Sequence, residues 1–205
     1  MVVSFEGSGV YYAATGREGQ LCRGSTVVVA GGGNSAGQAA MFLSESAERV
    51  LLVIRGEGLT KSMSSYLSRR VEAKGNIEIL AQTEIRKMMG GNVLEALELE
   101  NTKTNERRIV QTSAVFSMTG AKPGTGWLPP EIERDEKGFI KTGHAVVGAP
   151  AWKTMSRLPG PLETSWPGIF AAGDVRSGSV KRCAAAVGEG GMAVEGVQEV
   201  LKTYV

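Results

Sequence analysis

The sequence predicts an α/β fold of three layers, with a central parallel sheet and a small antiparallel sheet. Two patterns indicate this class. Short β-branched runs alternate with segments of helical periodicity between residues 26 and 80, and shorter runs separated by turns follow them. The composition agrees, because 42% of the residues are hydrophobic and 21% are charged, as is typical of globular chains.

Strands and helices are expected in alternation in the first part of the chain. Each predicted strand is a short aliphatic run, and each predicted helix has small or apolar residues at helical spacing. In order, these elements are expected at Thr26–Ala30, Asn34–Ser44, Arg49–Ile54, Met63–Lys74 and Ile77–Leu80. Strand–helix–strand order implies parallel strands joined by right-handed crossovers.

After Thr83 the pattern changes to short strands with turns at Gly90–Asn92 and Asn101–Asn105, which predicts the antiparallel sheet. A further strand is expected at Ala114–Met118. Prolines concentrate between residues 121 and 168, which predicts a loop-rich stretch. The chain then ends in a predicted strand, Ile169–Ala172, and a helix, Cys183–Lys202.

Composition excludes several classes of function. The net charge is +2 and basic residues do not cluster with aromatic ones, so we expect no nucleic-acid partner. No long apolar run occurs, so no membrane span is expected. Two cysteines and no signal-like start favour the cytoplasm. With one histidine, His144, we expect neither a metal site nor catalytic side chains, and a cofactor would carry any chemistry.

The most informative motif is a glycine-rich turn between a predicted strand and a predicted helix. It reads Gly31-x-Gly33-x-x-Ala36, where Gly31 permits a tight turn, Gly33 permits close approach of a pyrophosphate, and Ala36 permits close packing. Asn34 and Ser35 complete the helix start, whose free N–H groups favour an anion. We interpret the motif as a Rossmann-like dinucleotide site; the alternative is a turn that only packs.

The residue after the second strand bears on which dinucleotide binds. NAD and FAD sites usually have an acidic residue there, whereas this strand is followed by Arg55, which suits the 2′-phosphate of NADP(H). Glu57 leaves an NAD site open. Lys61, Arg69 and Arg70 are further basic candidates, although Arg69 and Arg70 also fit a solvated helix face, which we favour for Arg70.

Two segments resemble the thioredoxin reductase family of pyridine nucleotide-disulphide oxidoreductases. They are Thr26–Ala36 with the following Gln38-Ala-Ala, and the stretch from Gly168 to Asp174, Gly-Ile-Phe-Ala-Ala-Gly-Asp. The resemblance implies a Rossmann-like FAD/NAD(P)-binding fold and hydride transfer from NADPH to FAD. It implies an NADP(H)-binding domain with an N-terminal hinge segment at residues 1–117, and the C-terminal half of an FAD-binding domain at residues 118–205.

The resemblance also implies roles for further residues. Gly120 would lie near the nicotinamide, and Gly173 with Asp174 would contact the ribityl chain of FAD. The segment Lys181-Arg182-Cys183 would lie beside the flavin ring. Alternatively, Gly173 and Asp174 form an ordinary strand exit with a helix-capping aspartate.

The sequence departs from this family in two respects. Ala13 and Gly16 stand where the family has the two cysteines of its redox dithiol. The N-terminal half of the FAD domain is also not expected, because residues 1–24 are too short for a strand, turn and crossover helix.

We therefore predict an NAD(P)H-binding, thioredoxin reductase-like oxidoreductase that is truncated, has no dithiol of its own and is weak or inactive alone. NADP(H) is the expected cofactor, and FAD is expected to bind poorly or not at all. The alternatives are a non-catalytic NADP(H)-binding module, a docking partner of a separate flavin subunit, or an inactive fragment. A homodimer or a missing FAD half is the expected partner.

Overall fold

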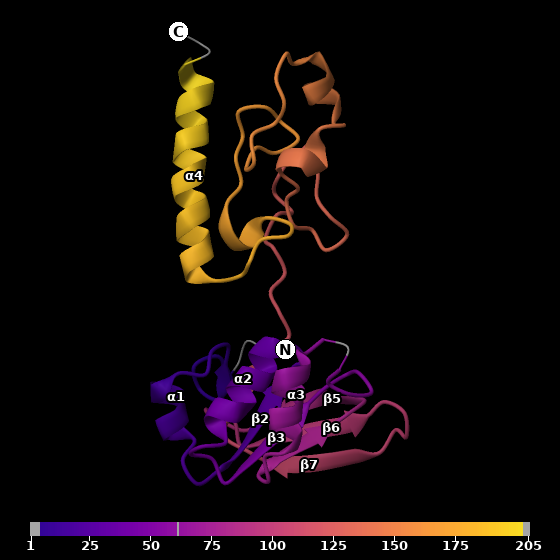
Figure 1. Ribbon diagram of the computed structural model, residues 1–205. Coiled ribbons are helices and arrows are strands. Elements are labelled where there is room, and N and C mark those ends of the chain that lie inside the picture. Colours follow the sequence, from indigo (N-terminus) through magenta and orange to yellow (C-terminus); the bar gives the residue numbers. More distant parts are fainter. Residues whose placement is uncertain (1–4, 61, 203–205) are drawn as a thin grey trace. The chain divides into compact units, whose positions relative to one another are not determined.

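The computed structural model describes residues 5–60 and 62–202, and the chain divides into two compact units, Met1–Gly120 and Ala121–Val205 (Figure 1). We call these the first and the second unit. Within the described residues, no helix is long and apolar enough to cross a lipid bilayer.

The first unit is built on a parallel sheet of five strands. They are β1 (Val10–Tyr11), β2 (Thr26–Ala30), β3 (Arg49–Val53), β4 (Ile77–Leu80) and β8 (Val115–Ser117). The spatial order is β1-β8-β2-β3-β4, and every neighbouring pair is parallel. Val28 lies opposite both Leu51 and Val115, which sets the register at the centre of the sheet. The predicted strands β2, β3, β4 and β8 are confirmed, with end shifts of one residue or so.

In the described part of the first unit, the α-helices beside this sheet are α1 (Gly16–Leu21), α2 (Asn34–Leu43) and α3 (Ser65–Glu72). One face of the sheet, which includes Val27 and Val29, packs with buried residues of α2 and α3. The hydrophobic spacing that predicted α2 and α3 therefore marks the faces that they bury.

The second face of the sheet is covered by an antiparallel sheet rather than by helices. This sheet has the order β5-β6-β7 and contains β5 (Thr83–Met89), β6 (Ala96–Asn101) and β7 (Arg107–Gln111). Leu97 and Leu99 of β6 pack against Val28 and Leu51 of the parallel sheet. The layers are therefore helices, parallel sheet and antiparallel sheet, which confirms the predicted fold class.

Two elements at the start of the chain were not predicted. β1 has only two residues, too few for a periodicity, and it exists because it pairs with β8. α1 is short, but its Thr15–Glu18 capping box is a sequence signal for a helix start, and the structure contains it: the amide of Thr15 donates to Glu18 Oε2 at 3.1 Å.

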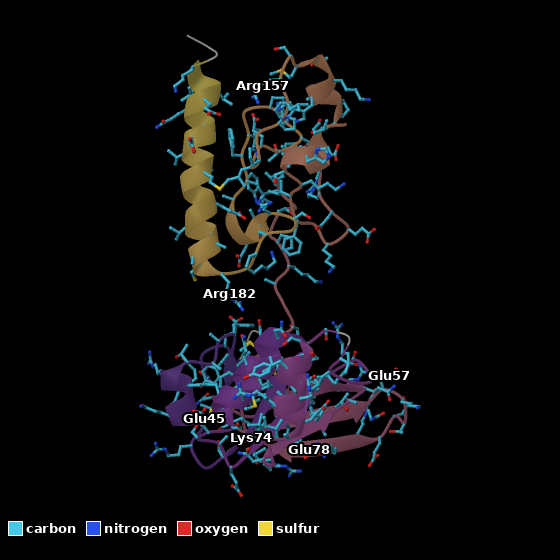
Figure 2. All side chains as sticks on the ribbon, in the orientation of Figure 1. Glu45, Glu57, Lys74, Glu78, Arg157 and Arg182 are labelled. Carbon is cyan, nitrogen blue, oxygen red and sulfur yellow. The ribbon has the colours of Figure 1, made fainter. Side chains whose placement is uncertain are left out.

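The second unit consists mostly of loops, as the prolines predicted. Its regular elements are the 3₁₀ turns η2 (Gly143–Val146), η3 (Pro150–Thr154) and η4 (Gly173–Val175), and the helix α4 (Cys183–Lys202). Glu163, 1% exposed, organises one loop: it accepts hydrogen bonds from Arg157 at 2.6 and 2.7 Å and from the amide of Gly160 at 2.8 Å (Figure 2 labels Arg157).

The predicted strand Ile169–Ala172 is wrong. Within the described residues, Phe170 forms an isolated bridge with Glu163, and the segment has no regular strand pairing. A short apolar run becomes a strand only where a partner strand satisfies its N–H and C=O groups, and periodicity cannot report that partner. The helix α4 is confirmed at its predicted bounds, but none of its residues, all of which are described, is buried.

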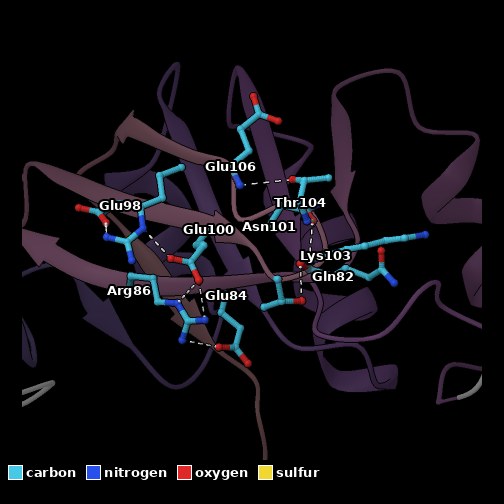
Figure 3. A network of polar contacts seen from close by, with 11 residues as sticks. Gln82, Glu84, Arg86, Glu98, Glu100, Asn101, Lys103, Thr104 and Glu106 are labelled. Carbon is cyan, nitrogen blue, oxygen red and sulfur yellow. Dashed lines mark hydrogen bonds and ion pairs between the residues drawn. The ribbon is translucent and has the colours of Figure 1, made fainter.

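A network of charges lies on β6 and its two neighbouring strands (Figure 3). The buried carboxylate of Glu100 accepts hydrogen bonds from Arg86 at 2.8 and 3.0 Å and from Arg107 at 2.6 Å. Arg86 also pairs with Glu84, and Arg107 with Glu98. The hydrogen bonds from Arg86 and Arg107 lower the pKa of Glu100 below its usual value of 4.5.

We predict that Glu100→Gln destabilises the first unit at neutral pH. Because the pKa of Glu100 is lower in the folded chain, its charge stabilises the fold above about pH 4.5, and this contribution is lost as pH falls through the folded-state pKa. Urea unfolding, followed by circular dichroism, should show a lower free energy of unfolding for the variant than for wild type at neutral pH, and this difference should disappear in acid. A difference that does not change with pH would contradict this. Glu106→Gln, at an exposed site, is the control.

Candidate nucleotide-binding site

The turn after β2 is built around a glycine that no other residue can replace without strain. Gly31 has φ +140°, and a Cβ placed there would lie 2.5 Å from the carbonyl oxygen of Met118, just beyond β8. The amide of Gly31 donates to the carbonyl of Val53 at 2.9 Å, which ties the turn to the end of β3. The turn therefore lies tightly between the two strands that flank β2.

The helix α2 begins immediately after this turn. Gly33 is its extended N-cap, and the first intrahelical bond runs from the amide of Gly37 to Gly33 at 3.1 Å. The amides of Asn34, Ser35 and Ala36 thus have no acceptor within the helix, as at any helix start. Asn34 and Ser35 are exposed, whereas Ala36 is fully buried beside Gly31. The start of α2 can therefore present N–H groups and the positive end of the helix dipole to an anion.

The segment before α3 braces the glycine-rich turn, which the sequence did not reveal. Ser62 Oγ donates to the carbonyl of Gly32 at 2.8 Å, and the amide of Ser64 donates to Asn34 Oδ1 at 2.8 Å. Met63 packs so closely on α2 that a Cβ at Gly37 would lie 2.7 Å from its sulfur. These bonds link residues about thirty positions apart, so no local pattern encodes them.

The strand order places this turn at a topological switch point. From β2 the chain continues to β3 on one side, and β8 lies on the other side. In open α/β sheets, ligands bind in the crevice that such a reversal leaves at the carboxyl ends of the strands. Gly120 follows β8 at this same edge and has φ +86°. The structure therefore brings Gly120 and the Gly31–Ala36 turn to one edge of the sheet.

The basic candidates differ in their surroundings. Arg55 is exposed and follows β3, so it also lies at the carboxyl edge of the sheet. Arg69 bonds through Nε to the carbonyl of Ser65 at 3.1 Å. Arg70 bonds to the hydroxyl of Tyr66 at 3.2 Å and lies 5.5 Å from its ring centroid, as a residue of a solvated helix face does. Lys61 lies outside the described residues.

The two cysteines of this chain are free thiols, and each belongs to a different unit. Cys22 is 1% exposed in the core of the first unit, and its burial raises the pKa of its thiol. Cys183 is the first residue of α4 in the second unit and is exposed. Ala13 and Gly16 lie before and at the start of α1, and both are exposed. In the described part of the chain, no group of three or more His, Cys, Asp or Glu residues could hold a metal ion.

The flavin candidates lie together in the second unit, around the start of α4. Gly173 is buried with φ +72°, and Asp174 after it is exposed. Lys181 Nζ donates to the carbonyl of Asp174 at 2.7 Å and lies 3.9 Å from the ring centroid of Phe139. Arg182, labelled in Figure 2, donates to the carbonyl of Lys181 at 3.2 Å, directly before Cys183.

We predict that Gly31→Ala lowers the free energy of unfolding of the first unit by about 2 kcal/mol or more, because the new Cβ meets the Met118 carbonyl and φ +140° is strained for alanine. Gly75→Ala is the matched control, since open space surrounds Gly75. Urea unfolding of each variant, followed by circular dichroism, measures the loss. Equal stabilities of the two variants would contradict the prediction.

Comparison with known proteins extends over most of the chain. A family model described as pyridine nucleotide-disulphide oxidoreductase matches residues 11–190. Thioredoxin reductase 1 of Saccharomyces cerevisiae is 33% identical over 182 residues, which are 88% of this chain and 52% of that protein. A 34.2 kDa protein in a rubredoxin operon of Clostridium pasteurianum is 31% identical over 86% of this chain and 51% of its own length.

Solved structures of thioredoxin reductases are also similar to this chain. The thioredoxin reductase of T. acidophilum is 27% identical with a TM-score of 0.71, covering 97% of this chain and 59% of that one. The thioredoxin reductase from Streptococcus pyogenes is 29% identical with a TM-score of 0.62, covering 96% and 58%. This chain spans about half the length of the curated relatives that it matches. It belongs to the pyridine nucleotide-disulphide oxidoreductase family and is thioredoxin reductase-like.

Proposed function

We propose that the first unit binds NADP(H) at the carboxyl edge of its parallel sheet. The observation that carries the proposal is the Gly31–Ala36 turn, which opens α2 at the topological switch point. The pyrophosphate would meet the amides of Gly33, Asn34, Ser35 and Ala36, and the absence of a side chain at Gly33 leaves room for its approach. The name of the family, which refers to pyridine nucleotides, supports this choice of ligand.

Arg55 would bind the 2′-phosphate of the adenosine ribose. It is an exposed cation at the end of β3, and no acidic residue stands directly at that strand end to bond a free 2′-hydroxyl. A guanidinium can form two parallel hydrogen bonds with a phosphate. Gly120, at the end of β8, would lie near the nicotinamide.

We also propose an NADP(H)-binding domain at residues 1–117 and the C-terminal half of an FAD-binding domain at residues 118–205, which includes the whole second unit. The exposed carboxylate of Asp174 and the close turn at Gly173 fit a polyol chain such as the ribityl of FAD. Lys181, Arg182 and Cys183 lead into the start of α4 and would lie near the flavin. When both cofactors are bound, they supply the chemistry, a hydride transfer from nicotinamide to flavin.

The electron acceptor would not be a disulfide of this chain. Thiol–disulfide exchange needs a thiolate close to a second sulfur. Cys22 is buried and the pKa of its thiol is raised, and by the resemblance of the sequence Ala13 and Gly16 would stand at the positions of the family's dithiol. We therefore propose an oxidoreductase of the cytoplasm, where thiols stay reduced, that passes electrons from NADPH to another acceptor.

A second candidate function is a non-catalytic NADP(H)-binding module that docks to a flavin-bearing subunit or to a second copy. The helix α4 favours it, because apolar side chains along it are exposed: Val187 at 76%, Val194 at 60% and Leu201 at 58%. Exposed apolar patches of this kind often mark interaction sites.

We predict that Arg55→Ala weakens NADPH binding about tenfold or more, through loss of the pair with the 2′-phosphate, and leaves NADH binding unchanged. Fluorescence titration of each nucleotide measures both affinities. Arg23→Ala is the control, because Arg23 is exposed but precedes β2 and so lies at the opposite edge of the sheet. An unchanged ratio of the two affinities in Arg55→Ala would refute the role of Arg55.

An assay of NADPH oxidation distinguishes the two candidate functions. For the oxidoreductase, we expect the full chain to oxidise NADPH when FAD and a dye acceptor are added, and Asp174→Ala to abolish this without affecting NADPH binding. The module instead binds NADPH and gives no turnover. Neither binding nor turnover would exclude both functions.

A further inference from the structure

Two charged residues of the second unit meet beside the turn that contains Gly173 and Asp174. Glu189, on α4, accepts a hydrogen bond from the amide of Gly173 at 2.7 Å through Oε2. The same oxygen accepts from Arg176 Nε at 3.1 Å, and Arg176 Nη2 bonds to Glu189 Oε1. The side chains of Arg176 and Glu189 are only 20% and 14% exposed, so this bidentate pair is largely withdrawn from water.

The buried amide of Gly173 needs this carboxylate. Gly173 has φ +72°, and a Cβ there would lie 3.2 Å from Cβ of Ala186, so the turn packs directly on α4. A buried N–H without an acceptor is costly, and the turn offers none in regular secondary structure. Ala186 and Glu189 lie three positions apart on the helix and so share one face, which meets the turn by packing and by hydrogen bonding.

Arg176 connects the turn to the rest of the second unit. Its amide donates to the carbonyl of Gly173 at 3.1 Å, and its Nη1 lies 3.4 Å from Thr142 Oγ1. The next residue, Ser177, donates through its hydroxyl to Asp135 Oδ2 at 2.7 Å. Because Arg176 also pairs with Glu189, one guanidinium joins α4, the turn and the loop around Thr142.

We propose that Glu189 and Arg176 are positioning residues that hold the Gly173–Asp174 turn against α4, in the geometry with which Asp174 meets the flavin. This inference rests on the proposed function for its flavin contact, while the clamp itself involves this chain alone. Asp174 directly follows the amide that Glu189 holds, so release of that amide displaces Asp174. Hydrogen bonds from Arg176 and from Gly173 lower the pKa of Glu189, so it is charged at neutral pH.

The first test needs no flavin. Amide hydrogen exchange is measured by NMR on the full chain for wild type, Glu189→Ala, Glu189→Gln, Arg176→Lys and the control Glu195→Ala, an exposed residue of the same helix. Glu189→Ala should speed exchange of the Gly173 amide about tenfold or more. Glu189→Gln keeps an acceptor oxygen and should restore part of the protection, and Arg176→Lys should give an intermediate loss.

The reference amide is that of Ala171, which donates to Leu162 at 2.9 Å. Faster exchange at Gly173 with unchanged exchange at Ala171 supports positioning. Equal acceleration at both sites means general destabilisation and overturns the proposal, as does an unchanged rate at Gly173.

The second test titrates FAD by the quenching of its fluorescence. If wild type binds FAD, Glu189→Ala should bind it about tenfold more weakly and Glu195→Ala should match wild type. Equal affinities of wild type and Glu189→Ala overturn the flavin role of the clamp. If wild type binds no FAD, the proposed flavin contact fails, and the exchange experiment still decides whether the clamp holds the turn.

Discussion

The close approach of Gly31 to the Met118 carbonyl, with a hypothetical Cβ only 2.5 Å from that oxygen, is the constraint on which the carboxyl edge of the parallel sheet depends. It lets the chain turn sharply between β3 and β8, so that α2 starts at the edge of the sheet. A side chain there would push the turn away from β8 and move the helix start with it. The bonds of Ser62 and Ser64 to the turn and to Asn34 then fix the other side. The edge is thus preorganised, which would limit the entropic cost of binding the proposed dinucleotide.

The second unit is stabilised differently, because it has little regular secondary structure in which its backbone N–H and C=O groups can pair. Buried glutamates accept hydrogen bonds from some of its backbone amides instead. Glu163 holds one loop through Arg157 and backbone amides, and Glu189 holds the η4 turn through Arg176 and Gly173. Gly196 brings α4 close to Phe170, since a Cβ there would lie 2.7 Å from the ring. Together these contacts orient α4 although none of its residues is buried. Its outer face keeps exposed apolar side chains that a partner could cover.

Prediction from the sequence was most accurate where local pattern and tertiary role coincide. Aliphatic runs became β2 and β3 because buried parallel strands need such residues on both faces, and the run Ile77–Leu80 became the half-buried edge strand β4. The prediction missed β1, whose two residues form a strand only because β8 pairs with them. It was wrong at Ile169–Ala172, where Phe170 forms an isolated bridge to Glu163. For the candidate site, the glycine-rich turn was identified from its spacing. The supports at Ser62, Ser64 and Glu189 were not, since nothing in the periodicity distinguishes them from other polar residues.

By itself, the sequence determined the α/β class and the strand–turn–helix that opens α2, since these depend on residue type and short spacing. The tertiary structure decided which strands are neighbours, and therefore that Gly120 and Arg55 share an edge with the Gly31 turn. It also decided that an antiparallel sheet covers the second face. These outcomes depend on contacts between residues far apart in the chain, which hydrogen bonding and packing select only once the sheet has assembled.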